Sequence, residues 1–120
     1  MIKTTFAAAM LIFASMTASS AQAHGKIVAS EPKAGAELSA GPSHIRLRFN
    51  ERLESAFSKI GLVDVSEVAV ALPAVTVDKI DPNVMVAAVP ALAAGQYRVR
   101  WSAMTRDGHK THGEFGFRVR

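Results

Sequence analysis

The sequence contains no cysteine. Disulfide bonds and thiolate metal sites are therefore excluded, and the fold must be held by buried apolar side chains and by hydrogen bonds between strands. The motifs of several enzyme classes are also missing: there is no glycine-rich phosphate loop, no His-Glu-x-x-His zinc motif and no serine in a nucleophile elbow. We therefore expect a protein that is not an enzyme.

Long stretches of charge or hydrophobicity are scarce as well. The formal net charge is +4, but no basic run with interleaved aromatic residues is present, so we expect no nucleic-acid partner. After residue 23 no apolar segment approaches the ~20 residues needed to span a bilayer, and helical periodicity is hard to find. We therefore expect no membrane insertion and at most a helical turn at residues 53–58.

One apolar run is present, at the N-terminus. Lys3 precedes an apolar stretch at residues 6–16, and the small residues AQA at 21–23 form a cleavage signal. This pattern favours a cleaved signal peptide, residues 1–23, over an N-terminal core helix. We predict cleavage after Ala23 and export of a mature chain, residues 24–120, which forms a single domain of about 97 residues and acts as a monomer.

Short strands separated by turn residues fill the mature chain. The clearest is residues 44–49, where Ile45, Leu47 and Phe49 alternate with polar residues. Further strands are expected at residues 27–28, 57–65, 68–77 (an edge strand or two short strands, because of Pro73), 84–86, 97–101 and 115–119. About seven strands predict an all-β fold, a small antiparallel sandwich or Greek-key barrel, with Trp101 at the centre of the core.

The connection between the last two strands holds the residues best suited to bind a metal. Asp107 and His109 flank Gly108, and in an extended segment residues i and i+2 project to the same side. The alternative is an Asp-Gly turn followed by a solvated histidine. His24, once it is the first mature residue, offers an α-amine and an imidazole that can chelate one ion; the alternative is a solvated terminus. Three nitrogens and one oxygen suit the tetragonal geometry of Cu(II).

The other polar candidates have weaker signals. His112 is expected beside the metal ligands or in solvent, with a direct ligand role as the minority alternative. His44 is expected to be an ordinary surface histidine, and Glu51 a solvated loop carboxylate. Cu(I) sites need several clustered methionines, and the mature chain has only Met85 and Met104, both expected in the core.

Three segments in a fixed order carry a family resemblance. They are SEPKAGA at 30–36, which follows His24, then LRFNE at 47–51, and GQYRVRW at 95–101 leading to DGH at 107–109 and GEFGF at 113–117. Together they resemble the CopC-type periplasmic copper-binding proteins over nearly the whole mature chain. The resemblance implies a Greek-key β-barrel of cupredoxin or immunoglobulin-like shape, located in the periplasm.

The resemblance also implies a ligand set. It assigns a Cu(II) ion to His24, Asp107 and His109, and it makes Glu51 a partner close to the ligands. Some members of the family carry a methionine- and histidine-rich segment for Cu(I), but residues 63–71 contain neither residue type. We therefore expect binding of Cu(II) alone.

The expected function is copper sequestration or delivery in copper homeostasis or resistance, and the resemblance suggests an inner-membrane copper transporter as the recipient. Two alternatives remain open at this point. One is a copper-dependent oxidase or monooxygenase that uses an N-terminal histidine chelate, although an aspartate ligand would leave no easy open position on the ion. The other is a β-sandwich interaction module without a metal.

Overall fold

The structure, a computed structural model, describes residues 26–120. The elements of this part of the chain are β1 (Ile27–Glu31), β2 (Glu37–Leu38), β3 (His44–Phe49), the 3-10 helix η1 (Ser55–Phe57), β4 (Lys59–Asp64), β5 (Ala69–Val70), β6 (Thr76–Val77), β7 (Val84–Ala88), β8 (Gly95–Met104) and β9 (Lys110–Val119). No helix among these residues has the length and apolar character needed to cross a membrane. The predicted signal peptide and His24 lie outside the described residues.

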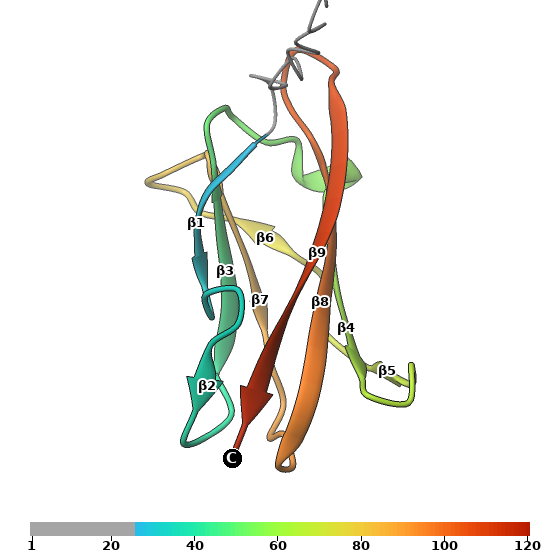
Figure 1. The fold of residues 1–120 in the computed structure, drawn as a ribbon. Helices are drawn as coiled ribbons and strands as arrows, with labels where there is room; N and C mark the ends of the chain where they lie inside the picture. The colour runs from blue at the N-terminus through green and yellow to red at the C-terminus, as the bar shows by residue number, and fades with distance from the viewer. Residues whose placement is uncertain (1–25) are drawn as a thin grey trace, which may run out of the picture.

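The strands form two sheets that pack face to face (Figure 1). One sheet has the order β1-β3-β7-β6 and the other the order β2-β9-β8-β4-β5. The chain changes sheet at five connections: β1 to β2, β2 to β3, β3 to β4, β5 to β6 and β7 to β8. The predicted all-β sandwich is therefore confirmed.

Alternating apolar residues build the core between the sheets. In β3 the side chains of Ile45, Leu47 and Phe49 are fully buried, while the residues between them are exposed. The other sheet contributes side chains that face them across the core, chiefly Ile60, Leu62, Val99, Ala103, Phe117 and Val119. Burying apolar side chains of this size stabilises a fold by about 1.5–3 kcal/mol each. This burial supports the fold without disulfide bonds.

Three expectations about the fold were wrong in detail. The described chain has nine strands rather than seven, because β2 was not foreseen and residues 68–77 form two short strands, one of the two arrangements expected there, in different sheets. Phe57, expected to begin a strand, lies instead in η1 with 60% of its surface exposed, and β4 begins only at Lys59. Trp101 is half-buried and packs edge-on against Phe49, with ring centroids 5.1 Å apart, so it lies at the margin of the core.

The pairing of β2 also departs from the predicted antiparallel pattern. Glu37 and Leu38 run parallel to Arg118 and Val119 of β9. The Gly35 N–H, just before β2, donates a 2.7 Å hydrogen bond to the Gly116 carbonyl, which holds the two segments together. Two residues are too few to show the alternation from which a strand can be recognised in a sequence.

The long hairpin of β8 and β9 reaches the end of the sandwich where the candidate site lies. Its strands pair from Gly95 and Val119 at one end to Met104 and Lys110 at the other. Trp101 lies opposite Gly113, and a Cβ atom on that glycine would be only 2.7 Å from the indole ring. The glycine therefore makes room for the tryptophan close to the loop.

Candidate metal centre

A tight turn joins β8 to β9 and carries Asp107 and His109. The Gly108 N–H donates to the Thr105 carbonyl at 2.9 Å, and the Thr105 N–H donates to the His109 carbonyl at 2.9 Å. Gly108 has φ +90°, a conformation that glycine adopts readily and side-chain-bearing residues rarely. This arrangement, a β-turn followed by a glycine with positive φ, is a common three-residue hairpin connection.

The turn brings the two predicted ligands into contact. Nδ1 of His109 lies 2.9 Å from Oδ2 of Asp107, and both side chains are about half-exposed. From the sequence we predicted that an extended segment would project both side chains to the same side. That prediction was wrong, because the segment is a turn. The Asp-Gly turn, which we considered as an alternative to a metal site, is what brings the Asp107 carboxylate to the His109 imidazole.

Thr105 holds the carboxylate from the other side. Its side chain is fully buried, and its hydroxyl donates a hydrogen bond to Oδ1 of Asp107. The backbone N–H of His109 lies 3.4 Å from the same oxygen. The Thr105 hydroxyl and, next, the His109 ring lower the pKa of Asp107 from 3.8 to about 2. The carboxylate is therefore ionised in the metal-free protein, as a ligand must be.

The segment after β3 lies against this turn. The Arg106 N–H donates to the Arg52 carbonyl at 3.0 Å, and Leu53 forms an isolated antiparallel bridge with Thr105. Glu51 directly precedes this contact and is half-buried. Glu51 therefore lies at the same end of the sandwich as Asp107 and His109, and its role beside the ligands stays a prediction.

The first described residue is held to the same segment. The Lys26 N–H donates to Oδ1 of Asn50 at 3.0 Å, and the Asn50 N–H donates back to the Lys26 carbonyl at 3.0 Å. Figure 1 shows that the start of β1, the end of β3 and the connection from β8 to β9 all lie at one end of the molecule. The described chain therefore begins at the end of the molecule that carries Asp107 and His109.

The remaining histidines occupy different places. His112 pairs with Ser102 in the hairpin and is exposed, but it lines a surface hollow that is also lined by Lys26 and Trp101. His44 begins β3 at the opposite end of that strand, where the Ser43 hydroxyl lies 3.0 Å from its Nδ1. His44 is thus a surface histidine, as predicted. Of the two methionines, Met85 is fully buried and Met104 is half-buried.

Within residues 26–120, no cluster of three or more histidine, aspartate or glutamate side chains could hold a metal ion. Asp107 and His109 therefore form a pair of donors, and a complete mononuclear site needs donors from elsewhere. His24 would supply two nitrogens, and it lies outside the described residues.

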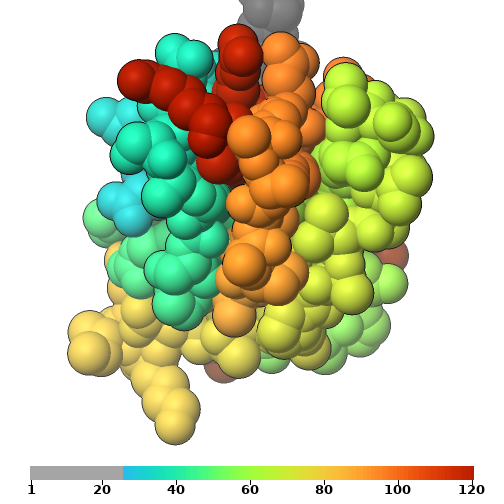
Figure 2. Space-filling view, turned by 90° about the horizontal axis from the view of Figure 1, so that it is seen from below, coloured from blue at the N-terminus to red at the C-terminus, as the bar shows by residue number. Residues whose placement is uncertain are grey.

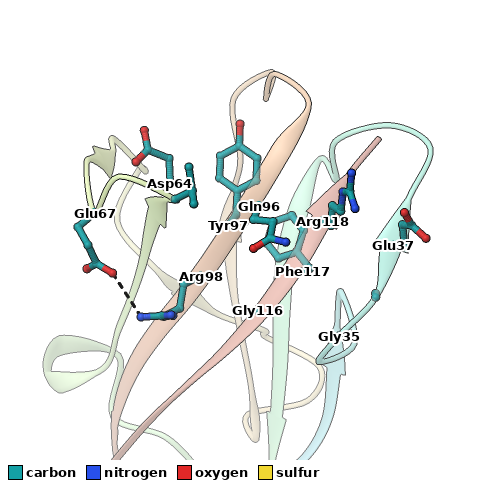
Figure 3. Close-up of a pocket in the computed structure, with 12 residues that line it drawn as sticks. Gly35, Glu37, Asp64, Glu67, Gln96, Tyr97, Arg98, Gly116, Phe117 and Arg118 are labelled. Atoms are coloured by element: carbon teal, nitrogen blue, oxygen red, sulfur yellow. Dashed lines mark hydrogen bonds and ion pairs between the residues drawn. The ribbon is translucent and has the colours of Figure 1, made fainter.

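A hollow of about 500 Å³ lies elsewhere, over the exposed side of β8 and β9 (Figure 3). Arg98 and Glu67, which form an ion pair at 3.3 Å, stand on one side of it, and Glu37 stands on the other. None of the predicted site residues lines this hollow. It is therefore separate from the candidate metal centre.

Two residues of the site were missed from the sequence. Thr105 could have been noticed, because a threonine hydroxyl two residues before an aspartate in a turn commonly bonds locally. Asn50 carried no such signal, since its partner Lys26 is 24 positions away.

Comparisons of the sequence with a family model and with known proteins point to the same family. The family model described as the CopC domain matches residues 27–120. Copper resistance protein C of Pseudomonas syringae pv. tomato is 39% identical, with 98% of this chain and 93% of that protein covered. Protein YobA of Escherichia coli K12 is 31% identical over 92% of this chain and 90% of its own. Copper transport protein CutJ of Bacillus subtilis is 27% identical over 92% of this chain, which spans only 20% of that longer protein.

Solved structures agree with the sequence relatives. The crystal structure of CopC from Methylosinus trichosporium OB3b superposes with a TM-score of 0.76 at 29% identity, covering 80% of this chain and 93% of that one. PcoC, a methionine-rich copper resistance protein from Escherichia coli, superposes with a TM-score of 0.72 at 34% identity, covering 81% and 99%.

Proposed function

The chain belongs to the CopC domain family, and on that basis we propose that it is a periplasmic protein that binds one Cu(II) ion for copper resistance or homeostasis. Its ligands are the α-amine and imidazole of His24, the carboxylate of Asp107 and the imidazole of His109. Cleavage of the signal peptide after Ala23 creates the amine ligand. The single domain, residues 24–120, acts as a monomer and has no catalytic role.

The contact between Asp107 and His109 carries this proposal. With metal–ligand bonds of about 2.0 Å, two donors at a right angle lie about 2.8 Å apart, whereas two donors at the tetrahedral angle lie about 3.3 Å apart. The observed separation of Nδ1 and Oδ2 is 2.9 Å. A hydrogen bond has the same length, and the pair could become adjacent ligands of a square-planar ion with no change in their separation. An ion bound by both atoms would displace the proton of this hydrogen bond and would lie to one side of the line that joins the two atoms.

The donor types favour Cu(II) over other ions. Three nitrogens and one carboxylate oxygen suit tetragonal coordination, and Cu(II) binds such donors more tightly than the other divalent first-row metals. Residues 63–71, which span the end of β4, the turn after it and all of β5, contain no methionine or histidine. A separate Cu(I) site is therefore not part of the proposal.

Beyond copper binding, the proposed role includes delivery of the copper to a second protein. A site at one end of a small domain is accessible to a second protein, and Asp107 and His109 are about half-exposed. A relative named for copper transport contains a segment that matches nearly the whole of this chain. We therefore expect an inner-membrane copper transporter as the recipient, with sequestration in the periplasm when no recipient is bound.

Measurement of Cu(II) affinity in the mature protein tests the proposed ligands. Asp107→Ala and His109→Ala should each weaken binding by more than about 100-fold, because each removes a direct ligand, and changes to residues that only support a ligand already cost 10–100-fold. His44→Ala is the matched control, since that histidine lies at the far end of β3, and it should bind as the wild type does. Equal affinity in His109→Ala and His44→Ala would contradict the assignment.

A further inference from the structure

The turn that carries Asp107 and His109 is anchored to the body of the sandwich through Thr105. Residues 106–109 are all exposed, whereas Thr105 is fully buried. Thr105 forms an isolated bridge with Leu53, which is also buried. Just before it, the Met104 carbonyl accepts the Glu54 N–H at 2.9 Å. The position of Thr105 is therefore set by the segment after β3 as well as by the hairpin.

The hydroxyl of Thr105 is committed to the Asp107 carboxylate. A hydroxyl has one hydrogen to donate, and this one donates to Oδ1 of Asp107. A second acceptor, the His109 carbonyl, lies 3.3 Å away, but it already accepts the Thr105 N–H at 2.9 Å. Because the hydroxyl is buried, it cannot turn to water instead, and a buried donor that loses its acceptor costs free energy. Rotation of the Asp107 side chain away from Thr105 is therefore unfavourable.

This hydrogen bond distinguishes the two oxygens of the carboxylate. Oδ1 accepts the Thr105 hydroxyl and lies 3.4 Å from the His109 backbone N–H. Oδ2 lies 2.9 Å from Nδ1 of His109. A carboxylate can bind a metal through one oxygen or through both, and a side chain that rotates freely must lose that freedom when it binds. With Oδ1 held by Thr105, Oδ2 is the oxygen that stands beside the imidazole before any ion arrives.

We infer that Thr105 is the positioning residue of the donor pair: its buried hydroxyl holds the Asp107 carboxylate so that Oδ2 alone is presented to an ion, together with Nδ1 of His109. This inference rests on the proposed function, in which both side chains are ligands. Thr105 is not itself a ligand. It acts through Asp107, in the way that hydrogen-bond partners behind a metal ligand fix the orientation of that ligand.

Removal of the hydroxyl alone tests the inference in the exported mature protein. Thr105→Val keeps the branched shape without the donor, and it should raise the Cu(II) dissociation constant about 10- to 100-fold, the usual cost of losing a partner that orients a metal ligand. Thr105→Ser keeps the hydroxyl and should restore most of the affinity. In the metal-free protein, three-bond NMR couplings should show one χ1 rotamer of Asp107 in the wild type and in the serine variant. The valine variant should show a mixture of rotamers.

Ser58→Ala is the matched control. The Ser58 hydroxyl belongs to another buried residue, donates to the Glu54 carbonyl at 2.8 Å and accepts the Met104 N–H at 3.2 Å. Its loss should lower stability but leave the copper affinity and the Asp107 rotamer unchanged.

Three results would overturn the inference while the proposed function stands. They are a Thr105→Val affinity within about twofold of the wild type or equal to that of Ser58→Ala, a Thr105→Ser affinity as weak as that of Thr105→Val, and a single Asp107 rotamer in the valine variant. A Cu(II) affinity that Asp107→Ala leaves unchanged would instead overturn the proposed ligand set, and the inference with it.

Discussion

At the scale of single residues, Thr105 determines how the Asp107 carboxylate behaves. A fully buried hydroxyl donates to one carboxylate oxygen, and the other oxygen faces the His109 imidazole. Hydrogen bonds to the charged form of an acid lower its pKa. One oxygen is thus held by the protein, and the second is left to interact with the imidazole or with an ion.

Thr105→Val should raise the pKa of Asp107 from about 2 toward its usual value of 3.8. The Thr105 hydroxyl is the largest cause of the depression, and valine keeps the shape of the side chain without the donor. Because the folded-state pKa is depressed, its contribution to stability is present above about pH 4 and is lost as the pH falls through about 2. Thr105→Val should therefore be less stable than the wild type above about pH 4, and this difference should disappear as the pH falls through about 2. A carboxyl NMR titration measures the change, and an unmoved Asp107 pKa would refute it.

Copper binding should consequently have a pH dependence set by its nitrogen donors. Asp107, with a pKa of about 2, remains ionised over the whole range in which the protein is handled. The His24 amine has a reference pKa of 7.7–8.0, so protons compete with the ion below that range. The apparent Cu(II) affinity should rise from pH 6 to pH 8 and then level off. A titration series at fixed ionic strength tests this, and an affinity that is flat between pH 6 and 8 would argue against an amine ligand.

Gly113 is the residue whose replacement should disturb the hairpin most directly. In Gly113→Ala the new methyl group would lie 2.7 Å from the Trp101 ring, and that ring is packed edge-on against Phe49. We expect a loss of about 1–3 kcal/mol in the free energy of unfolding, because overpacking displaces neighbouring groups. Gly116→Ala is the control, since its methyl group would lie at an ordinary 3.5 Å from the Tyr97 carbonyl. Equal urea midpoints for the two variants would contradict the expectation.

At the scale of elements, strands were predictable where their side chains alternate over several residues. β3 has the expected bounds because Ile45, Leu47 and Phe49 must all face the core. β2, β5 and β6 have two residues each, and such pairs become strands only because a neighbouring strand offers hydrogen bonds. That information lies in tertiary structure and not in the local pattern.

The turn from β4 to β5 shows a second feature that local patterns do not reveal. Glu67 has φ +63°, and its carboxylate pairs with Arg98 and Arg100 on β8. The Asp64 side chain accepts the N–H groups of Ser66 and Val68, which fixes the turn. The ion pairs are exposed and contribute little. The shape of the turn therefore comes mainly from Asp64, and Glu67 holds an unfavourable backbone conformation.

Glu67→Gly should be more stable than Glu67→Ala by about 0.5–1 kcal/mol. Both variants lose the ion pairs, so their difference isolates the backbone. A left-handed conformation costs a non-glycine residue about 1–2 kcal/mol. Glycine avoids this cost, but ordering its more flexible unfolded backbone offsets part of the gain in stability. Chemical denaturation of the two variants measures the difference. An alanine variant as stable as the glycine variant would show that the turn adopts another conformation.

At the scale of the whole molecule, three segments far apart in the sequence meet at one end of the sandwich. They are the start of β1, the segment after β3 and the turn between β8 and β9 (Figure 1). The space-filling view from below shows that the loop between β6 and β7 also projects from the body (Figure 2). The candidate site therefore depends on strand connections that bring these three distant segments together.

This explains how far the sequence could predict the site. Asp107 and His109 were singled out by their spacing in the sequence, although it is the turn, and not an extended strand, that brings their side chains together. The positions of Glu51 and Asn50 depend on pairing between β1 and β3 and on contacts of Arg52 and Leu53 with the hairpin. Such contacts cannot be derived from one sequence by spacing alone, and the family resemblance supplied only the expectation for Glu51.

The central claim is that the free amine of His24 completes a Cu(II) site with Asp107 and His109. Mass spectrometry of the exported protein, followed by copper EPR on that protein and on a variant with one glycine added before His24, tests it most directly. The account predicts a mature chain that begins at His24 and a tetragonal Cu(II) spectrum with nitrogen couplings. It further predicts that the added glycine greatly weakens binding and changes the spectrum. An extended protein with the same affinity and the same spectrum would contradict the claim.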